Sequence, residues 1–85
     1  MLGYKITFAR SARKELQDLP IDVAERMLKK IGSLASNARP SGCTKLRGAT
    51  DLWRIRSGDY RVIYSKTGDG VLILRIGPRN KVYDR

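Results

Sequence analysis

The sequence predicts a small α+β domain in which a helical hairpin covers one mostly antiparallel sheet. Three observations predict this class. The first half carries apolar residues at helical spacing, the second half carries short runs rich in β-branched and aromatic residues, and turn sequences separate those runs. With 85 residues, the chain fits one domain spanning residues 1–85, with room for one modest core.

The N-terminal half is expected to form one strand and two helices. Tyr4–Phe8 alternates in polarity, which is typical of a strand. Ser11 is the expected N-cap of a first helix, which Pro20 closes. A second helix is expected to begin at Asp22, and a loop is expected over Asn37–Gly42. The buried stripe of the second helix is predicted to comprise Val23, Met27, Ile31 and Leu34.

The C-terminal half is predicted to be a three-stranded antiparallel meander. Its strands are expected at Leu52–Ser57, Tyr60–Lys66 and Val71–Ile76, which makes a four-stranded sheet together with the N-terminal strand. Gly58-Asp59 suits a two-residue type II′ turn, because glycine is favoured at its first position. We assign no element to residues 77–85, a short and highly charged segment.

The expected turn fixes which side chains share a face of the sheet. If Gly58 and Asp59 form the loop, Arg56 lies opposite Arg61 on the next strand. Because side chains alternate between faces, the hairpin divides into an apolar face and a basic face. The apolar face, which the helices are expected to cover, collects Trp53, Ile55, Tyr60, Val62 and Tyr64. The basic face collects Arg54, Arg56 and Arg61.

The charge of the chain favours a polyanionic partner. Eighteen Lys and Arg against eight Asp and Glu give a net charge of +10. No stretch is typical of a secretory signal or a transmembrane span, so nucleic acid is favoured over a membrane surface. Cys43 is the only cysteine, which suits a reducing cytoplasm.

The composition also narrows the possible chemistry. The chain has no histidine, which excludes every Ser-His or Cys-His arrangement, and its carboxylates form no metal-binding pattern. We therefore expect neither a metal nor a cofactor. Arg56 facing Arg61 is a like-charge conflict that the fold does not need, and such conflicts are expected where an anionic ligand binds. The alternative interpretation is a solvated basic strand face. Arginine favours phosphate, because its planar fork binds two oxygens at once.

Several segments together resemble the RelE/ParE toxin superfamily over nearly the whole chain. They are Ser11–Leu16, Lys45–Gly48, Leu52–Arg56, Gly58–Tyr64 and Arg79–Tyr83. The resemblance implies a RelE-like fold and a toxin of a type II toxin–antitoxin pair. RelE-like members enter the ribosomal A site and cut the mRNA there without a metal, leaving a 2′,3′-cyclic phosphate and a 5′-hydroxyl.

The resemblance also assigns roles by position. It implies that the catalytic residues are Arg54, Arg56, Arg61, Arg79 and Tyr83. Further contacts to RNA and the ribosome are expected from Lys45, Arg47, Lys81 and Arg85. Guanidinium groups suit stabilisation of a phosphorane, but they are poor bases because arginine stays protonated. Tyr83 is a candidate acid or base only if neighbouring arginines stabilise its phenolate. The proton-transfer groups stay unassigned.

Two rival functions remain at this stage. Members of the ParE branch share the fold but poison DNA gyrase without nuclease activity. The basic cluster and the tail tyrosine favour the RelE branch. The second rival is a non-enzymatic cationic RNA-binding module. The expected partners of the toxin are a cognate antitoxin protein, the ribosome and mRNA, in the cytoplasm, with no membrane and no small-molecule cofactor.

Overall fold

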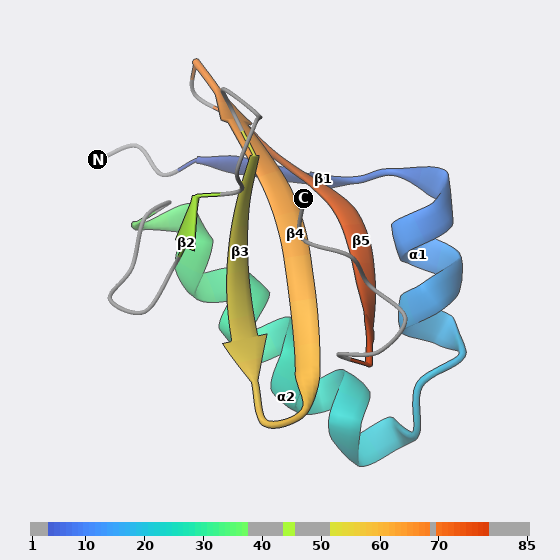
Figure 1. The fold of residues 1–85 in the computed structure, drawn as a ribbon. Coiled ribbons are helices and arrows are strands. Elements are labelled where there is room, and N and C mark those ends of the chain that lie inside the picture. The colour runs from blue at the N-terminus through green and yellow to red at the C-terminus, as the bar shows by residue number, and fades with distance from the viewer. Residues whose placement is uncertain (1–3, 38–43, 46–51, 69, 79–85) are drawn as a thin grey trace.

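The computed structural model describes residues 4–37, 44–45, 52–68 and 70–78. These residues form two α-helices, one short 3-10 helix and five strands (Figure 1). In chain order they are β1 (Lys5–Phe8), α1 (Arg10–Gln17), α2 (Ile21–Gly32), η1 (Ser33–Ala35), β2 (Thr44–Lys45), β3 (Leu52–Ser57), β4 (Tyr60–Thr67) and β5 (Gly70–Pro78). The predicted α+β class is confirmed.

The strands form one sheet in the order β1-β5-β4-β3-β2. As predicted, β3, β4 and β5 are an antiparallel meander. The first strand, β1, pairs in parallel with the last, β5, so the sheet is mixed but mostly antiparallel. The four predicted strands are present, and the two-residue β2 adds to them by pairing with β3. A strand this short leaves no alternating pattern in the sequence, so the prediction did not include it.

The β3–β4 hairpin has the predicted register. Arg56 lies opposite Arg61, and Ile55 lies opposite Val62. Gly58 has a φ of +61°, whereas no non-glycine residue of the described ranges has a positive φ. A positive φ at the first loop position alone is the mark of the predicted type II′ turn. The next pairing, β4 with β5, has a register shift at Ile63/Tyr64, which is a β-bulge.

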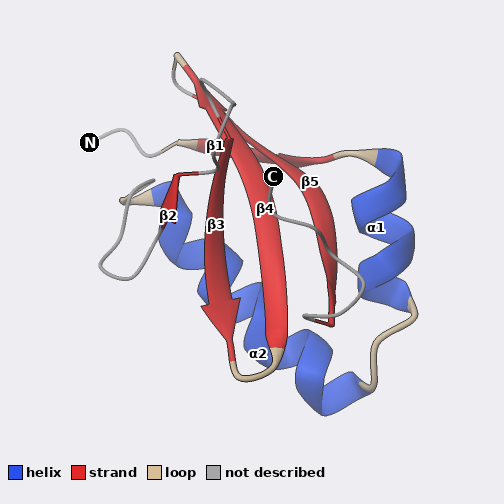
Figure 2. Cartoon of the chain, viewed as in Figure 1, coloured by secondary structure: helices blue, strands red, loops and turns tan. Residues whose placement is uncertain are grey.

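The core lies between the helices and one face of the sheet. Figure 2 shows α2 crossing behind β3 and β4, with α1 alongside β5. The predicted stripe of α2 and η1 is buried there, with Val23, Met27, Ile31 and Leu34 each at most 9% exposed. From the sheet side, the core receives Ile55, Val62, Tyr64, Val71, Ile73 and Ile76. The apolar face of the hairpin therefore points at the helices, as the alternation of its side chains predicts.

Three local predictions need comment. Ser11 is not the N-cap: α1 begins at Arg10, and Ala9 is the N-cap, without a side-chain hydrogen bond. The hydroxyl of Ser11 instead donates to the carbonyl of Leu74, 3.2 Å away on β5. The second helix begins one residue earlier than predicted, with Pro20 as its N-cap. Of the predicted loop Asn37–Gly42, residues 38–42 lie outside the described residues.

Replacing Gly58 by alanine is expected to destabilise the fold through backbone conformation alone. An added Cβ meets no atom within 4 Å, but the residue keeps a φ of +61°. The left-handed conformation costs a side-chain-bearing residue roughly 1–2 kcal/mol. For a domain of this size, the melting temperature should fall by about 4–8 °C for each kcal/mol lost from the free energy of unfolding.

The matched control for this prediction is Gly32→Ala at the end of α2. Gly32 has a φ of −59°, and an added Cβ there also meets nothing within 4 Å. Because alanine is the better helix former, the melting temperature should stay level or rise. Equal melting temperatures for the Gly58→Ala variant and the unchanged protein would contradict the turn assignment.

Candidate nucleic-acid interface

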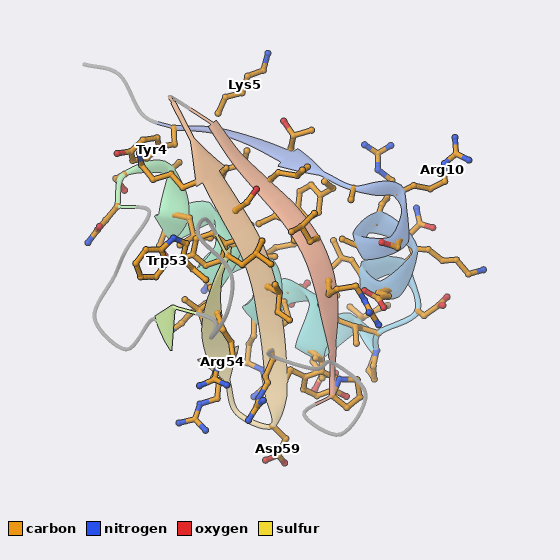
Figure 3. The ribbon with its side chains drawn as sticks, turned by 45° about the horizontal axis from the view of Figure 1, so that its top comes forward. Tyr4, Lys5, Arg10, Trp53, Arg54 and Asp59 are labelled. Carbon is orange, nitrogen blue, oxygen red and sulfur yellow. The ribbon has the colours of Figure 1, made fainter. Side chains whose placement is uncertain are left out.

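Three arginines converge on the sheet face that the described helices leave open. Arg54 and Arg56 come from β3, and Arg61 comes from β4 directly opposite Arg56. Directly paired residues have Cβ atoms about 4.5–5.5 Å apart, which brings these guanidinium groups within reach of one ligand. Arg56 is exposed, whereas Arg54 and Arg61 are half-buried. Figure 3 shows the side chain of Arg54 extending away from β3. We call these three residues the arginine cluster.

The charges of the arginine cluster repel one another. The pKa of Arg54 is lowered from its ordinary value, first by burial and then by repulsion from Arg61 and Arg56. All three causes disfavour the charged guanidinium, and a bound anion would offset the repulsion between the arginines. The cluster thus concentrates like charges on one part of the sheet, as expected of a phosphate-binding surface.

The opposite side of the same hairpin anchors it. Ile55, Val62 and Tyr64 are at most 2% exposed, and Trp53 and Tyr60 pack against the core from the rim. Alternation therefore places the rings of Tyr60 and Tyr64 on the core side, away from the arginine cluster. The cluster stands on a hairpin that is rigid because its other face belongs to the hydrophobic core.

The neighbouring strand shapes the surroundings of Arg61. Gly77 of β5 pairs with Arg61, so no side chain of β5 stands directly beside that guanidinium. Ile63, which faces Arg54 across the strands, is 4% exposed and is absent from the core cluster under the helices. The arginine cluster is therefore bordered by the apolar Ile63 and by a glycine, Gly77, on β5.

Side chains of α1 complete the edge of β5 where β1 stops. The pairing of β1 with β5 ends at Phe8 and Ile73. Beyond that point Ser11 bonds to Leu74, and the carboxylate of Glu15 accepts a hydrogen bond from the backbone N–H of Ile76 at 2.8 Å. The second oxygen of Glu15 accepts from Nε of Arg75 at 3.0 Å. Glu15 was not among the predicted site residues. The pattern that could have pointed to it is its spacing of four residues from Ser11, which puts both side chains on the side of the helix next to the buried Ala12.

The other predicted site residues are only partly placed. Lys45 is described by its backbone alone, in β2 opposite Trp53. Outside the described residues lie Arg47, Arg79, Lys81, Tyr83 and Arg85. Their assigned roles stay predictions.

The described residues offer charge stabilisation as their main chemistry. Across residues 4–37, 44–45, 52–68 and 70–78, no three His, Cys, Asp or Glu side chains are grouped to hold a metal. None of the helices in these ranges has the length and apolar character needed to cross a membrane. Three guanidinium groups on one rigid face can bind a phosphate through paired, charge-assisted hydrogen bonds and can stabilise extra negative charge on it.

Proteins that are similar to this chain in sequence and fold are toxins. The model of the ParE toxin of type II toxin–antitoxin systems matches residues 6–83. Toxin RelE3 of Methanocaldococcus jannaschii is 29% identical over 84 residues, which cover 94% of this chain and 96% of that protein. The archaeal RelE–RelB complex of Pyrococcus horikoshii has a chain with 33% identity and a TM-score of 0.81, covering 95% of this chain and 100% of that one. The isolated E. coli RelE toxin has 28% identity and a TM-score of 0.79, covering 88% and 83%.

Proposed function

This chain belongs to the ParE toxin family of type II toxin–antitoxin systems, within the RelE/ParE superfamily, and from this premise we propose that it stops translation by cutting mRNA on the ribosome. The observation that carries the proposal is the arginine cluster, Arg54, Arg56 and Arg61, on the sheet face opposite the described helices. Its mutual repulsion favours an anion, and its composition of arginine alone favours phosphate.

The proposed reaction needs stabilisation of charge more than any other assistance. The 2′-hydroxyl of a nucleotide attacks the adjacent phosphorus, and the bond to the 5′-oxygen of the next nucleotide breaks. The proton lost by the 2′-hydroxyl is balanced by the proton that the 5′-oxygen gains. The products are a 2′,3′-cyclic phosphate and a 5′-hydroxyl. The phosphorane between them carries extra negative charge, which fixed guanidinium groups stabilise without reorganisation.

The proposed dependence on the ribosome follows from which side chains lie around the arginine cluster. Arginine is a poor base, and the rings of Tyr60 and Tyr64 lie on the core side of the hairpin. We propose that the ribosome supplies the alignment of the 2′-hydroxyl with its phosphate, an effect that can contribute about 7–11 kcal/mol to lowering a barrier. Cleavage of free RNA by the protein alone should therefore be very slow.

The proposed protein partner is a cognate antitoxin. The related RelE of Pyrococcus horikoshii was solved as a complex with RelB. A chain of net charge +10 that is toxic when free needs a partner that covers its cationic surface. We place the action of the toxin in the cytoplasm, where mRNA is translated.

In a coupled translation reaction, the purified protein is expected to stop protein synthesis and to produce mRNA fragments whose 5′ ends map inside codons. The physical reason is that ribosome-bound mRNA presents its phosphate, held in line, to the arginine cluster. Primer extension measures the new ends. The control is the same mRNA without ribosomes, which should stay intact, and efficient cutting of this naked RNA contradicts the proposal.

The match to the ParE family model favours one specific alternative, a gyrase poison without nuclease activity. The same protein preparation therefore enters a gyrase supercoiling assay. Trapped gyrase–DNA complexes with intact mRNA would support the alternative. If the protein is instead a non-enzymatic RNA-binding module, its binding to RNA should weaken steeply with salt, and the mRNA on ribosomes should show no new 5′ ends.

A further inference from the structure

We propose that Glu15 is a positioning residue, which holds the end of β5 beside Arg61 by binding the backbone N–H of Ile76. The inference rests on the proposed function, because it concerns the geometry of the same arginine cluster. It concerns a carboxylate on α1, an element that otherwise contributes packing and solvent-exposed charges.

Strand β5 extends beyond the end of its neighbour β1. β1 pairs with β5 only as far as Ile73, whereas β5 continues to Pro78. An uncovered strand edge exposes N–H and C=O groups that need partners. Here α1 supplies them, with the Ser11 hydroxyl on the Leu74 carbonyl and the Glu15 carboxylate on the Ile76 amide.

Glu15 binds a backbone amide of β5 as well as the side chain of Arg75. Oε1 accepts from the Ile76 amide at 2.8 Å, and Oε2 accepts from Arg75 Nε at 3.0 Å. The Arg75 side chain is 44% exposed, so its ion pair is screened and contributes little. The bond to the amide is partly buried, and a charged acceptor makes it one of the stronger kinds of hydrogen bond.

The hydrogen bond between Glu15 and the Ile76 amide lies next to the arginine cluster in the sheet. Ile76 lies opposite Val62, and the next residue, Gly77, lies opposite Arg61. The bulge at Ile63/Tyr64 interrupts the ladder between β4 and β5 just before this end of the strand. Glu15 fixes the strand just beyond that bulge. It thereby holds Gly77 in its place opposite Arg61.

The test compares Glu15→Ala, Glu15→Gln and Arg75→Met in ribosome-dependent mRNA cleavage. Glu15→Ala removes both contacts and is expected to slow cleavage between about 10- and 100-fold, the scale that a displacement of about 1 Å can produce. Its ribosome affinity should hardly change, so the effect appears in kcat and not in KM. Glu15→Gln keeps an oxygen for the Ile76 amide and should restore most of the rate. Arg75→Met breaks only the ion pair and should cut like the unchanged protein.

A matched control is Glu25→Ala, which removes an exposed carboxylate from α2 and should leave the rate unchanged. If Glu15→Ala does not fold, Glu15→Asp replaces it, because its shorter side chain withdraws from the amide while keeping the charge. A full cleavage rate in a variant that has only lost thermal stability overturns the proposal. An Arg75→Met variant as slow as Glu15→Ala overturns it as well.

One readout does not depend on cleavage. Amide hydrogen exchange of Ile76 and Gly77 should become faster in Glu15→Ala and should stay close to that of the unchanged protein in Arg75→Met. If the unchanged protein cuts no mRNA, the proposed function fails, and these two amides still decide whether Glu15 holds the end of β5. Unchanged amide signals in Glu15→Ala would overturn the positioning role.

Discussion

Replacing Arg61 by alanine is expected to abolish mRNA cleavage while ribosome binding largely survives. Arg61 lies on β4, inside the sheet, directly opposite Arg56, and its Nε atom is buried. A guanidinium fixed in this way stabilises charge that develops on the phosphorane. Removing one such fixed donor lowers kcat about 10²- to 10³-fold in well-studied sites. Single-turnover cleavage on saturating ribosomes measures the loss.

The controls for this prediction separate charge from geometry. Arg61→Lys keeps the charge without the planar fork and should fall between the alanine variant and the unchanged protein. Lys29→Ala removes one exposed cation from α2 and should leave the rate unchanged. If Arg61→Ala cuts at the full rate, or if it loses binding and cleavage in equal proportion, Arg61 is an ordinary phosphate contact. The non-enzymatic binding module would then be favoured.

The site is predictable from the sequence wherever short-range rules decide the structure. Gly58 and Asp59 fix the turn, the turn fixes the register, and alternation along the strands then assigns each side chain to a face. Nothing distant is needed to place Arg56 opposite Arg61, and the structure has this pair. The helical stripe from Val23 to Leu34 is predictable for the same reason, since its period is a local property.

The parts that escaped prediction depend on distant partners. Ser11 is a residue type that favours the N-cap, yet its hydroxyl binds Leu74, 63 residues away. Glu15 binds Ile76 over a separation of 61 residues, and no period or motif connects these two positions. The parallel pairing of β1 with β5 and the two-residue β2 are likewise decided by packing of the whole chain. Local patterns identify elements and faces, but not which free strand edge a helix will cover.

The described side chains around the arginine cluster bear on which group transfers protons in the proposed reaction. Burial, and then repulsion from Arg61 and Arg56, lower the pKa of Arg54, but arginine begins so high that the group still stays charged at neutral pH. Tyr60 packs against the core from the other face of the hairpin. Figure 3 shows Asp59 at the tip of the hairpin, with its carboxylate directed away from the sheet. Within the described residues, therefore, the surroundings of the cluster supply positive charge and no evident acid or base.

Replacing Tyr83 by phenylalanine is therefore expected to slow cleavage strongly, although the change removes only one oxygen. The resemblance to the RelE branch implies a catalytic role for this residue, and a phenolic hydroxyl is a group that can transfer a proton. General acid–base catalysis by one positioned group contributes about 10²- to 10⁴-fold, and a loss in this range is expected in kcat on the ribosome. Binding to the ribosome should change little, because the ring is kept.

Tyr60→Phe is the matched control for this last prediction. It also removes one phenolic oxygen, but from a ring that packs against the core, so the cleavage rate should stay unchanged. A Tyr83→Phe variant that cuts at the full rate would move proton transfer from the protein to the ribosome or to the RNA itself. The toxin would then act only by holding the phosphate and stabilising its charge. In that case Arg61→Ala would still be inactive, so the pair of variants distinguishes the two roles.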